Sequence, residues 1–276
     1  MINSYVPVLT VAGSDSSGGA GIQADIKTMS ALGCYGMSAI TAITAQNTTG
    51  VTAIQGIDPD IVAAQIDTVC ADIWPLATKT GMLYSADIAN AVADAFERNN
   101  LQNIVVDPVM VSTSGSKLIS DDAIEKVVSR LFPISTLITP NKAEAEALTG
   151  TTELSLQARR LHELGAKIVL LKGGDSDSTD YKTDYLSYSW EKTLTPIKSS
   201  AINTHNTHGT GCTLSSAIAS YLALGYDLYK SIKRAKKYIS YALFAGKNVI
   251  IGNGHGPVNH FFHPEKLKTR EYESIY

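Results

Sequence analysis

Residues 8–32 read VLTVAGSDSSGGAGIQADIKTMSAL, and this stretch decides the fold class. It opens with a short apolar run at residues 8–11 that is typical of a buried strand, and a glycine-rich turn follows. Ile22, Ile26 and Met29 then recur at the spacing of one helix face. The stretch therefore predicts a strand, a turn and a helix in that order.

The same alternation continues along the chain. A helical pattern, with apolar residues three or four positions apart, spans residues 62–73. Strands buried on both faces, with helices between them, predict one mostly parallel sheet covered by helices. No change in composition marks a boundary, so residues 1–276 are predicted to form a single α/β domain. Further short β-branched runs lie at residues 38–44, 51–54, 104–106, 137–139 and 168–171.

The composition limits the classes of partner. The chain has 276 residues, of which 44% are hydrophobic and 18% charged, and its formal net charge is −3. A charge of this sign gives nucleic acid no long-range attraction, so we expect no nucleic-acid partner. The basic residues between 230 and 237 alternate with apolar ones, which is typical of an amphipathic helix facing water rather than of a membrane surface.

Cysteine use and the N-terminal sequence predict a cytoplasmic protein. Cys34, Cys70 and Cys212 form no C-x-x-C pair, which favours neither disulfides nor a thiolate zinc site. No basic residue precedes the first apolar run, so a cleaved signal peptide is not expected. Residues 31–57 carry no charge, but the polar residues at 46–50 interrupt them. They therefore predict two buried strands and a turn rather than a membrane span.

Several polar residues follow predicted strands, where ligands bind in open α/β sheets. Gln46 could donate to and accept from the edge of a heterocycle, or it could satisfy loop backbone. Asp107 could approach a magnesium-bound phosphate, or it could form an Asp-Pro turn. Lys172, which two glycines follow, could bind phosphate or face water. Each signal is weak by itself.

Two acidic residues lie on predicted helices. Asp25 falls beside the apolar stripe of its helix, where it could accept hydrogen bonds from a polar ligand or be partly exposed. Asn141 and Glu144 have the spacing of a helix-capping arrangement. This arrangement is compatible with a second role for Glu144.

The strongest local signal is NTHGTGC at residues 206–212, which precedes a run of small and apolar residues typical of a buried helix. The N–H groups of Gly209, Thr210 and Gly211 would lie at the helix N-terminus and could bind a transferring phosphoryl group. Cys212 would lie in the first turn, where the helix dipole lowers a thiol pKa, so a thiolate could receive or orient a substrate hydroxyl proton. A tight turn with a small buried cysteine explains the pattern equally well.

Other motifs are missing from the sequence. Neither G-x-x-x-x-G-K-[ST] nor G-x-G-x-x-G occurs, which disfavours Walker-type and Rossmann nucleotide sites. His255 and His260 lack the spacing of metal ligands. Residues 175–184 are polar and predict an exposed hairpin or a flap.

The residues quoted above resemble the hydroxymethylpyrimidine and phosphomethylpyrimidine kinases of thiamine biosynthesis, which are members of the ribokinase-like superfamily. The resemblance covers nearly the whole chain and is carried by AGSDSSGGAG at residues 12–21, AQNT at 45–48, KTGML at 79–83, TPN at 139–141 and THGTGC at 207–212. It implies a three-layer α/β/α kinase that is commonly a homo-oligomer, here expected to be a dimer. It also implies that ATP and Mg²⁺ are used to phosphorylate 4-amino-5-hydroxymethyl-2-methylpyrimidine, and then its monophosphate to the diphosphate.

The resemblance also implies roles for individual residues. Gly209, Thr210 and Gly211 would form the anion hole, and Cys212 would act as a base or as a positioner of the substrate hydroxyl. The pyrimidine pocket would be lined by Gly13, Asp25, Thr44, Gln46, Met82 and Val109.

The remaining implied residues would serve the nucleotide. Lys172, Asp107 and Thr207 would contact ATP and its phosphates. Glu144 and Asp107 would hold magnesium, directly or through water.

Two other functions stay open at this point. A pyridoxal kinase of similar fold would share the opening motif and Cys212. Gln46 favours the aminopyrimidine over pyridoxal, because an amide matches a ring nitrogen and an exocyclic amine. A non-catalytic pyrimidine sensor is the second alternative, although the anion turn, the lysine and the acidic pair argue against it.

Overall fold

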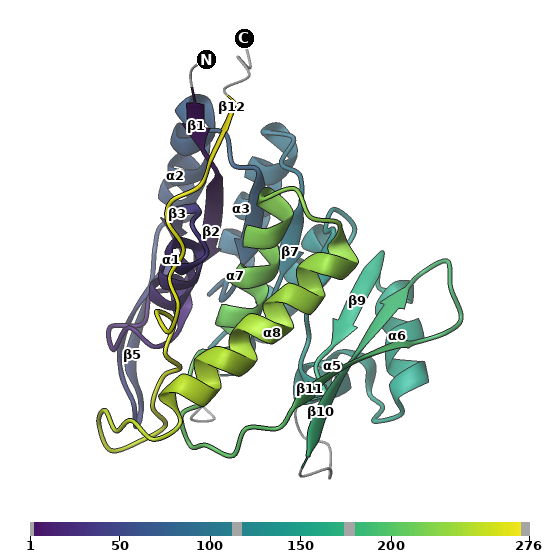
Figure 1. The fold of residues 1–276 in the computed structure, drawn as a ribbon. Helices are drawn as coiled ribbons and strands as arrows, with labels where there is room; N and C mark the ends of the chain where they lie inside the picture. The colour runs from purple at the N-terminus through teal and green to yellow at the C-terminus, as the bar shows by residue number, and fades with distance from the viewer. Residues whose placement is uncertain (1–2, 112–117, 174–179, 272–276) are drawn as a thin grey trace.

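The computed structural model describes residues 3–111, 118–173 and 180–271 (Figure 1). Its middle layer is an eight-stranded sheet. In spatial order the sheet contains β11 (Thr195–Ser200), β10 (Tyr181–Tyr188), β9 (Ile168–Leu171), β8 (Leu137–Ile138), β7 (Ile104–Val106), β6 (Ala77–Thr80), β2 (Pro7–Ala12) and β3 (Tyr35–Ile40). The strands from β9 to β3 run parallel, whereas β10 pairs antiparallel with both β9 and β11.

Helices cover both faces of this sheet. One face packs against α2 (Pro59–Asp72), α3 (Ala86–Arg98), the π-helix η1 (Val127–Leu131), α5 (Lys142–Thr149) and α6 (Leu154–Glu163), and α4 (Asp121–Lys126) packs on α3. The other face packs against α1 (Gly21–Ala31), α7 (Thr210–Ala223) and α8 (Leu228–Gly246), and Figure 1 shows α8 crossing in front of the sheet. The predicted three-layer α/β/α fold is therefore confirmed.

The central strands are buried on both faces, as predicted. Neighbouring residues of one strand enter opposite cores, because side chains alternate across a sheet. Val8 and Val105 pack with α1, α7 and α8, whereas Leu9 and Val106 pack with the helices of the opposite face. This double burial explains why the strands appear as short, nearly continuous apolar runs in the sequence.

Residues 38–44, predicted as one strand, are divided between two strands, because the chain leaves the main sheet at Thr41. The next strand, β4 (Ala42–Asn47), forms a separate antiparallel hairpin with β5 (Gly50–Gly56). Thr41 fixes this break: its N–H donates to the carbonyl of Ala12 at 3.0 Å, and its Oγ1 donates to the carbonyl of Met82 at 2.7 Å. The two strands and the turn predicted within residues 31–57 are therefore present in this hairpin, but only part of the hairpin is buried.

The two ends of the described chain pair with each other. The strand β1 (Asn3–Tyr5) is antiparallel to β12 (Thr269–Glu271), and the pair lies at the top of Figure 1. This is the amino edge of the sheet, because β1 leads directly into β2.

The segment predicted as an exposed hairpin or flap is described in part. Residues 175–179 lie outside the described residues, and residues 181–184 begin β10, which forms a hairpin with β11. Asp184 is buried at 2% exposure, so this part of the segment is not an exposed flap.

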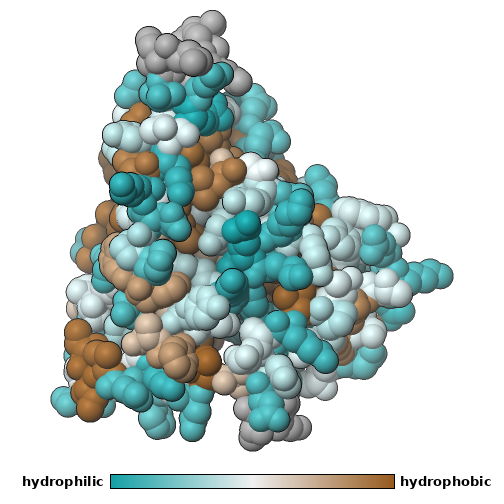
Figure 2. All heavy atoms as spheres, viewed as in Figure 1, coloured by the Kyte–Doolittle hydropathy of each residue, from teal (hydrophilic) through white to brown (hydrophobic). Residues whose placement is uncertain are grey.

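The helix α8 is amphipathic, as the sequence predicts. Ile232 and Ala235 are buried, and Figure 2 shows hydrophilic residues over the N-terminal part of the helix, while Tyr241 and Phe244 are exposed nearer its C-terminal end. In the N-terminal part the ammonium of Lys233 lies 5.6 Å from the ring centre of Tyr229. No helix in the described ranges is long and apolar enough to cross a membrane.

Candidate active site

A cavity of about 690 Å³ opens at the carboxyl ends of the parallel strands, next to the N-terminus of α7. This is the edge at which open α/β sheets bind ligands. Its walls include most of the predicted site residues: Gly13, Thr44, Gln46, Met82, Asp107, Val109, Glu144, Lys172, Thr207, Gly209, Thr210, Gly211 and Cys212.

The turn before α7 has the geometry of an anion-binding site. Gly209 adopts a left-handed conformation with φ of 77°, and a Cβ there would lie 1.9 Å from the carbonyl oxygen of Gly19, so the position requires glycine. The helix begins at the next residue, and the first N–H groups of a helix have no intrahelical acceptor. A Cβ added to Gly211 would lie 3.5 Å from both Lys172 Nζ and Asp107 Oδ2. The helix end and the Lys172 ammonium therefore face the same space.

Cys212 lines the cavity from the first turn of α7. Burial raises the pKa of its thiol to about 11, and the carboxylates of Asp25 and Asp107 add to the increase. The ammonium of Lys79 and the N–H of Gly21 lower the pKa without cancelling that increase. The predicted thiolate is therefore wrong, because desolvation of the charged form outweighs the helix dipole. At neutral pH the group is a thiol, which can position a hydroxyl but is a weak base.

Asp107 and Lys172 form an ion pair in the cavity wall. The Nζ of Lys172 lies 2.9 Å from Oδ1 of Asp107, which is 1% exposed. Hydroxyls of Thr139 and Ser215 donate to the same carboxylate at 3.0 and 3.2 Å. Burial works against the charged form, but Lys172 keeps the pKa of Asp107 below its ordinary value. A charged ammonium is thus held at the rim of the anion-binding turn.

Glu144 caps its helix, as its spacing predicts, and it also faces the cavity. It forms the predicted capping box with Asn141: Glu144 Oε2 accepts from the Asn141 N–H at 2.8 Å, and Asn141 Oδ1 accepts from the Glu144 N–H at 2.9 Å. Glu144 also lines the cavity. Burial raises the pKa of its carboxyl to about 7, with a contribution from Asp107, while Lys172 acts in the opposite direction.

Asp107 and Glu144 are chemically suited to magnesium. Both face the cavity, and each carboxylate lies near enough to influence the other. Magnesium in nucleotide sites is usually held by one or two carboxylates and keeps its waters and the substrate phosphates as further ligands. No group of three or more potential metal ligands occurs among the residues that the structure describes. The pair therefore fits a metal that arrives with phosphate rather than an all-protein cage.

Gln46 lies at another end of the cavity, on β4, and is half-buried rather than at a buried strand end. The Oγ1 of Thr44 lies 3.2 Å from Gln46 Oε1 and 2.7 Å from the carbonyl oxygen of Ser14. The Nε2 of Gln46 lies 3.5 Å from Nε2 of His208. These residues surround an amide that can both donate to and accept from a ligand in the cavity.

His208 and Asp15 line the cavity but are not among the predicted site residues. The Nε2 of His208 lies 2.7 Å from Asp15 Oδ2, which also accepts from the N–H of Ala20 at 2.8 Å. Burial works against the charged carboxylate, but the hydrogen bonds from His208 and Ser17 lower the pKa of Asp15 to about 2. The pair joins the turn after β2 to the turn before α7. Its only sequence signal is that both residues stand in these turns.

Met82 and Val109 supply an apolar part of the wall. A Cβ added to Gly13 would lie 2.6 Å from the terminal methyl carbon of Met82. The absence of a side chain at Gly13 therefore makes room for the Met82 side chain.

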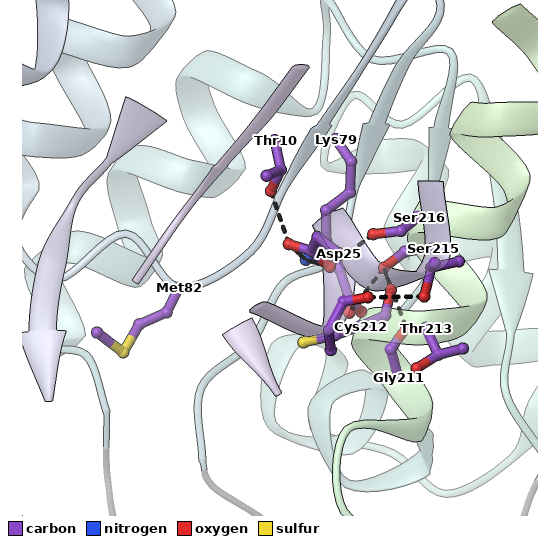
Figure 3. Close-up of polar contacts among 12 residues, drawn as sticks. Thr10, Asp25, Lys79, Met82, Gly211, Cys212, Thr213, Ser215 and Ser216 are labelled. Atoms are coloured by element: carbon purple, nitrogen blue, oxygen red, sulfur yellow. Dashed lines mark hydrogen bonds and ion pairs between the residues drawn. The ribbon is translucent and has the colours of Figure 1, made fainter. Parts of the chain in front are cut away.

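The structure corrects the predicted place of Asp25. This residue is fully buried and is not part of the cavity wall, so it is neither a pocket residue nor partly exposed. Its carboxylate lies 2.9 and 3.0 Å from Nζ of Lys79, which is also fully buried. Hydroxyls of Thr10 and Ser216 donate to it at 2.6 and 2.5 Å. Figure 3 shows this cluster beside Cys212.

Comparison with known proteins places the chain in a family. The family model described as phosphomethylpyrimidine kinase matches residues 15–259. The chain belongs to this family. Hydroxymethylpyrimidine/phosphomethylpyrimidine kinase of Rhizobium meliloti is 46% identical over 262 residues, which cover 92% of this chain and 96% of the relative. Thiamine biosynthesis bifunctional protein ThiED of Geobacter sulfurreducens is 49% identical over 271 residues, but the match covers 95% of this chain and only 54% of that protein.

Solved structures agree with the phosphomethylpyrimidine kinase family and its fold. The phosphomethylpyrimidine kinase of Clostridium difficile is 43% identical, with a TM-score of 0.75 over 86% of this chain and 99% of that chain. The pyridoxal kinase of Staphylococcus aureus in complex with AMP-PCP and pyridoxal is 32% identical, with a TM-score of 0.83 over 94% of this chain and 95% of that chain. The fold is thus shared with a kinase of another vitamin, and the cavity residues must decide the substrate.

Proposed function

We propose that this chain transfers a phosphoryl group from ATP to the hydroxymethyl group of 4-amino-5-hydroxymethyl-2-methylpyrimidine, and then a second one to the monophosphate, in thiamine biosynthesis. The names of its relatives support this activity. The observation that supports it most is that one cavity joins the amide of Gln46 to the N-terminus of α7. A polar group that recognises a ring and a site that stabilises a phosphoryl group thus share one space.

The pyrimidine would bind at the Gln46 end. The amide of Gln46 could accept from the exocyclic amine and donate to the adjacent ring nitrogen, a pattern that the half-buried site makes selective. Met82 and Val109 offer an apolar surface to the faces of the ring. This arrangement would direct the hydroxymethyl group towards Cys212.

The phosphoryl group would pass over the anion-binding turn. Phosphoryl transfer needs mainly in-line positioning and stabilisation of charge, because its transition state is loose. The first N–H groups of α7 and the ammonium of Lys172 would provide that stabilisation. The thiol of Cys212 would orient the attacking hydroxyl, whose proton need leave only late in such a reaction. A thiol with a pKa of about 11 is compatible with this positioning role.

ATP would occupy the part of the cavity between the anion-binding turn and β10, β11 and α8. Ile202, Ile239 and Leu243 line this part and could cover an adenine ring. Lys182 and Lys236 line it as well. Magnesium bound to the phosphates would neutralise their charge, and Asp107 and Glu144 would hold it directly or through water. The cavity volume of about 690 Å³ lies within the roughly 300–1,000 Å³ that is usual for ligand pockets.

The test supplies the alcohol and the monophosphate separately with ATP and magnesium and identifies the products by phosphorus NMR. We expect monophosphate and then diphosphate from the alcohol, and diphosphate from the monophosphate. Faster ADP release with pyridoxal than with the pyrimidine would replace the proposal by a pyridoxal kinase. Absence of substrate-dependent ADP release would instead indicate a pyrimidine sensor.

A further inference from the structure

A buried ion pair behind the anion-binding turn has no part in the mechanism above. Lys79 on β6 and Asp25 on α1 are both fully buried, and Lys79 Nζ lies 2.9 and 3.0 Å from the two carboxylate oxygens. Taking two charges out of water is costly, and a buried pair of this kind adds little to stability compared with apolar residues of the same volume. A structural role alone therefore does not explain the pair.

Asp25 connects this pair to the helix that carries Cys212. The Oγ of Ser216 donates to Asp25 Oδ1 at 2.5 Å, and the Oγ1 of Thr10 on β2 donates to Asp25 Oδ2 at 2.6 Å. Ser216 follows Cys212 by four residues, so both lie on one face of α7. The carboxylate thus ties this face of α7 to two central strands through Thr10 and Lys79 (Figure 3).

The same two helices meet again one turn earlier. The N–H of Gly21, at the start of α1, lies near enough to the Cys212 thiol to lower its pKa. Gly21 precedes Asp25 by four residues, as Cys212 precedes Ser216. The helices α1 and α7 therefore approach each other at two consecutive turns, and the Asp25 carboxylate hydrogen-bonds across them at the second.

The space around the ammonium is also fully used. A Cβ added to Gly81 would lie 2.9 Å from Lys79 Nζ and 3.0 Å from the Cβ of Ala12. The ammonium is therefore confined next to Asp25. Without Lys79, the carboxylate would retain the Thr10 and Ser216 hydroxyls but no cationic partner among the described residues.

We propose that Lys79 is a positioning residue for phosphoryl transfer. Its ammonium fixes the Asp25 carboxylate, and this carboxylate fixes the first turn of α7, so that Cys212 keeps its position in the cavity wall. This inference rests on the proposed function, since it assigns Lys79 to the same reaction. Lys79 touches neither the cavity nor a substrate, and it acts through Asp25 and Ser216.

The pair also sets the electrostatic surroundings of Cys212. Charged groups act on the thiol from four elements: Asp25 on α1, Lys79 on β6, Asp107 after β7 and Lys172 after β9. Lys79→Met would leave the Asp25 carboxylate near the thiol, and Asp25→Asn would leave the Lys79 ammonium there. The two variants should therefore shift the ionisation of Cys212 in opposite directions.

The experiment titrates the thiolate of Cys212 by its ultraviolet absorbance, as the difference between each variant and the same variant carrying Cys212→Ser. We expect the thiol pKa to rise in Lys79→Met, to fall in Asp25→Asn and to return towards the wild-type value in the double variant. We expect kcat to fall about 100-fold in each single variant, with KM for ATP changed less than about threefold. Lys230→Met, which replaces an exposed lysine, should change neither quantity.

Shifts of the same sign in both single variants, or a kcat within about threefold of wild type in Lys79→Met, would overturn the inference. If Lys79→Met does not fold, Asp25→Asn and the double variant make the same comparison, because the double variant restores electrical neutrality. The titration needs no substrate. If the wild-type chain did not turn over the pyrimidine, the proposed function would be contradicted. The titration would still test whether Lys79 and Asp25 act on Cys212.

Discussion

Gly211→Ala should separate activity from stability. The added methyl group would lie 3.5 Å from Asp107 Oδ2 and from Lys172 Nζ, which are ordinary contact distances. Alanine is favoured over glycine within a helix by up to about 1 kcal/mol, so the free energy of unfolding should not decrease. The methyl group would nevertheless occupy the space proposed for the phosphoryl group. A displacement of about 1 Å in that group costs on the order of 100-fold in rate, and we expect kcat to fall by about this factor.

The assay combines ADP release with urea unfolding, and Gly225→Ala is the matched control. Gly225 follows α7 with φ of +85°, and apart from its chain neighbours no described residue has an atom within 4 Å of an added Cβ. This control should lose about 1–2 kcal/mol of stability through backbone strain and keep its kcat. A folded Gly211→Ala variant with kcat within about threefold of wild type would refute the placement of the phosphoryl group.

Three further predictions concern the other end of the cavity. Gln46→Leu should lower kcat/KM for the pyrimidine by about 10–100-fold, because two polar groups of the ligand lose their hydrogen-bond partner. Substrate-independent ATP hydrolysis should stay unchanged, and an equal loss of the two activities would contradict the role of Gln46. Gly13→Ala should raise KM for the pyrimidine with little change in kcat, since the new Cβ would displace the Met82 methyl carbon 2.6 Å away. The pKa of Asp15 is about 2 in the folded chain, whereas the ordinary pKa of an aspartate is 3.8. The Asp15 carboxylate therefore stabilises the fold above about pH 4, and this stabilisation disappears as the pH falls towards 2. This contribution is about 2 kcal/mol, so between pH 4 and pH 2 the free energy of unfolding, measured in urea, should fall less in Asp15→Asn than in the wild type. The same pH dependence in both proteins would contradict the importance of the His208 contact.

The layered fold could be predicted because its signals are local. Double burial makes the central strands apolar, and the helices between them repeat at their own period. The hairpin of β4 and β5 could not be placed in the same way. One apolar run crosses Thr41, and only contacts with distant residues, such as the carbonyl of Met82, show where the chain leaves the sheet.

The predicted residues that follow strands or begin a helix do line one cavity, because the topology brings these positions to one edge of the sheet. Asp25 was misplaced, since its partners Lys79 and Ser216 are distant in sequence and the helical spacing reveals neither. The thiolate at Cys212 was wrong because a helix terminus can be recognised from sequence, whereas the burial that raises the pKa cannot. The cytoplasmic location and the dimer stay predictions.

The pairing of β1 with β12 has a practical consequence. Asn3 lies opposite Glu271, at the amino edge of the sheet, whereas the cavity opens at the carboxyl edge. A short peptide linker could therefore join Asn3 to Glu271 without approaching the cavity, and the chain could be reopened in an exposed turn elsewhere. The molecule is thus a candidate for circular permutation, in which the order of its elements changes while their arrangement is retained.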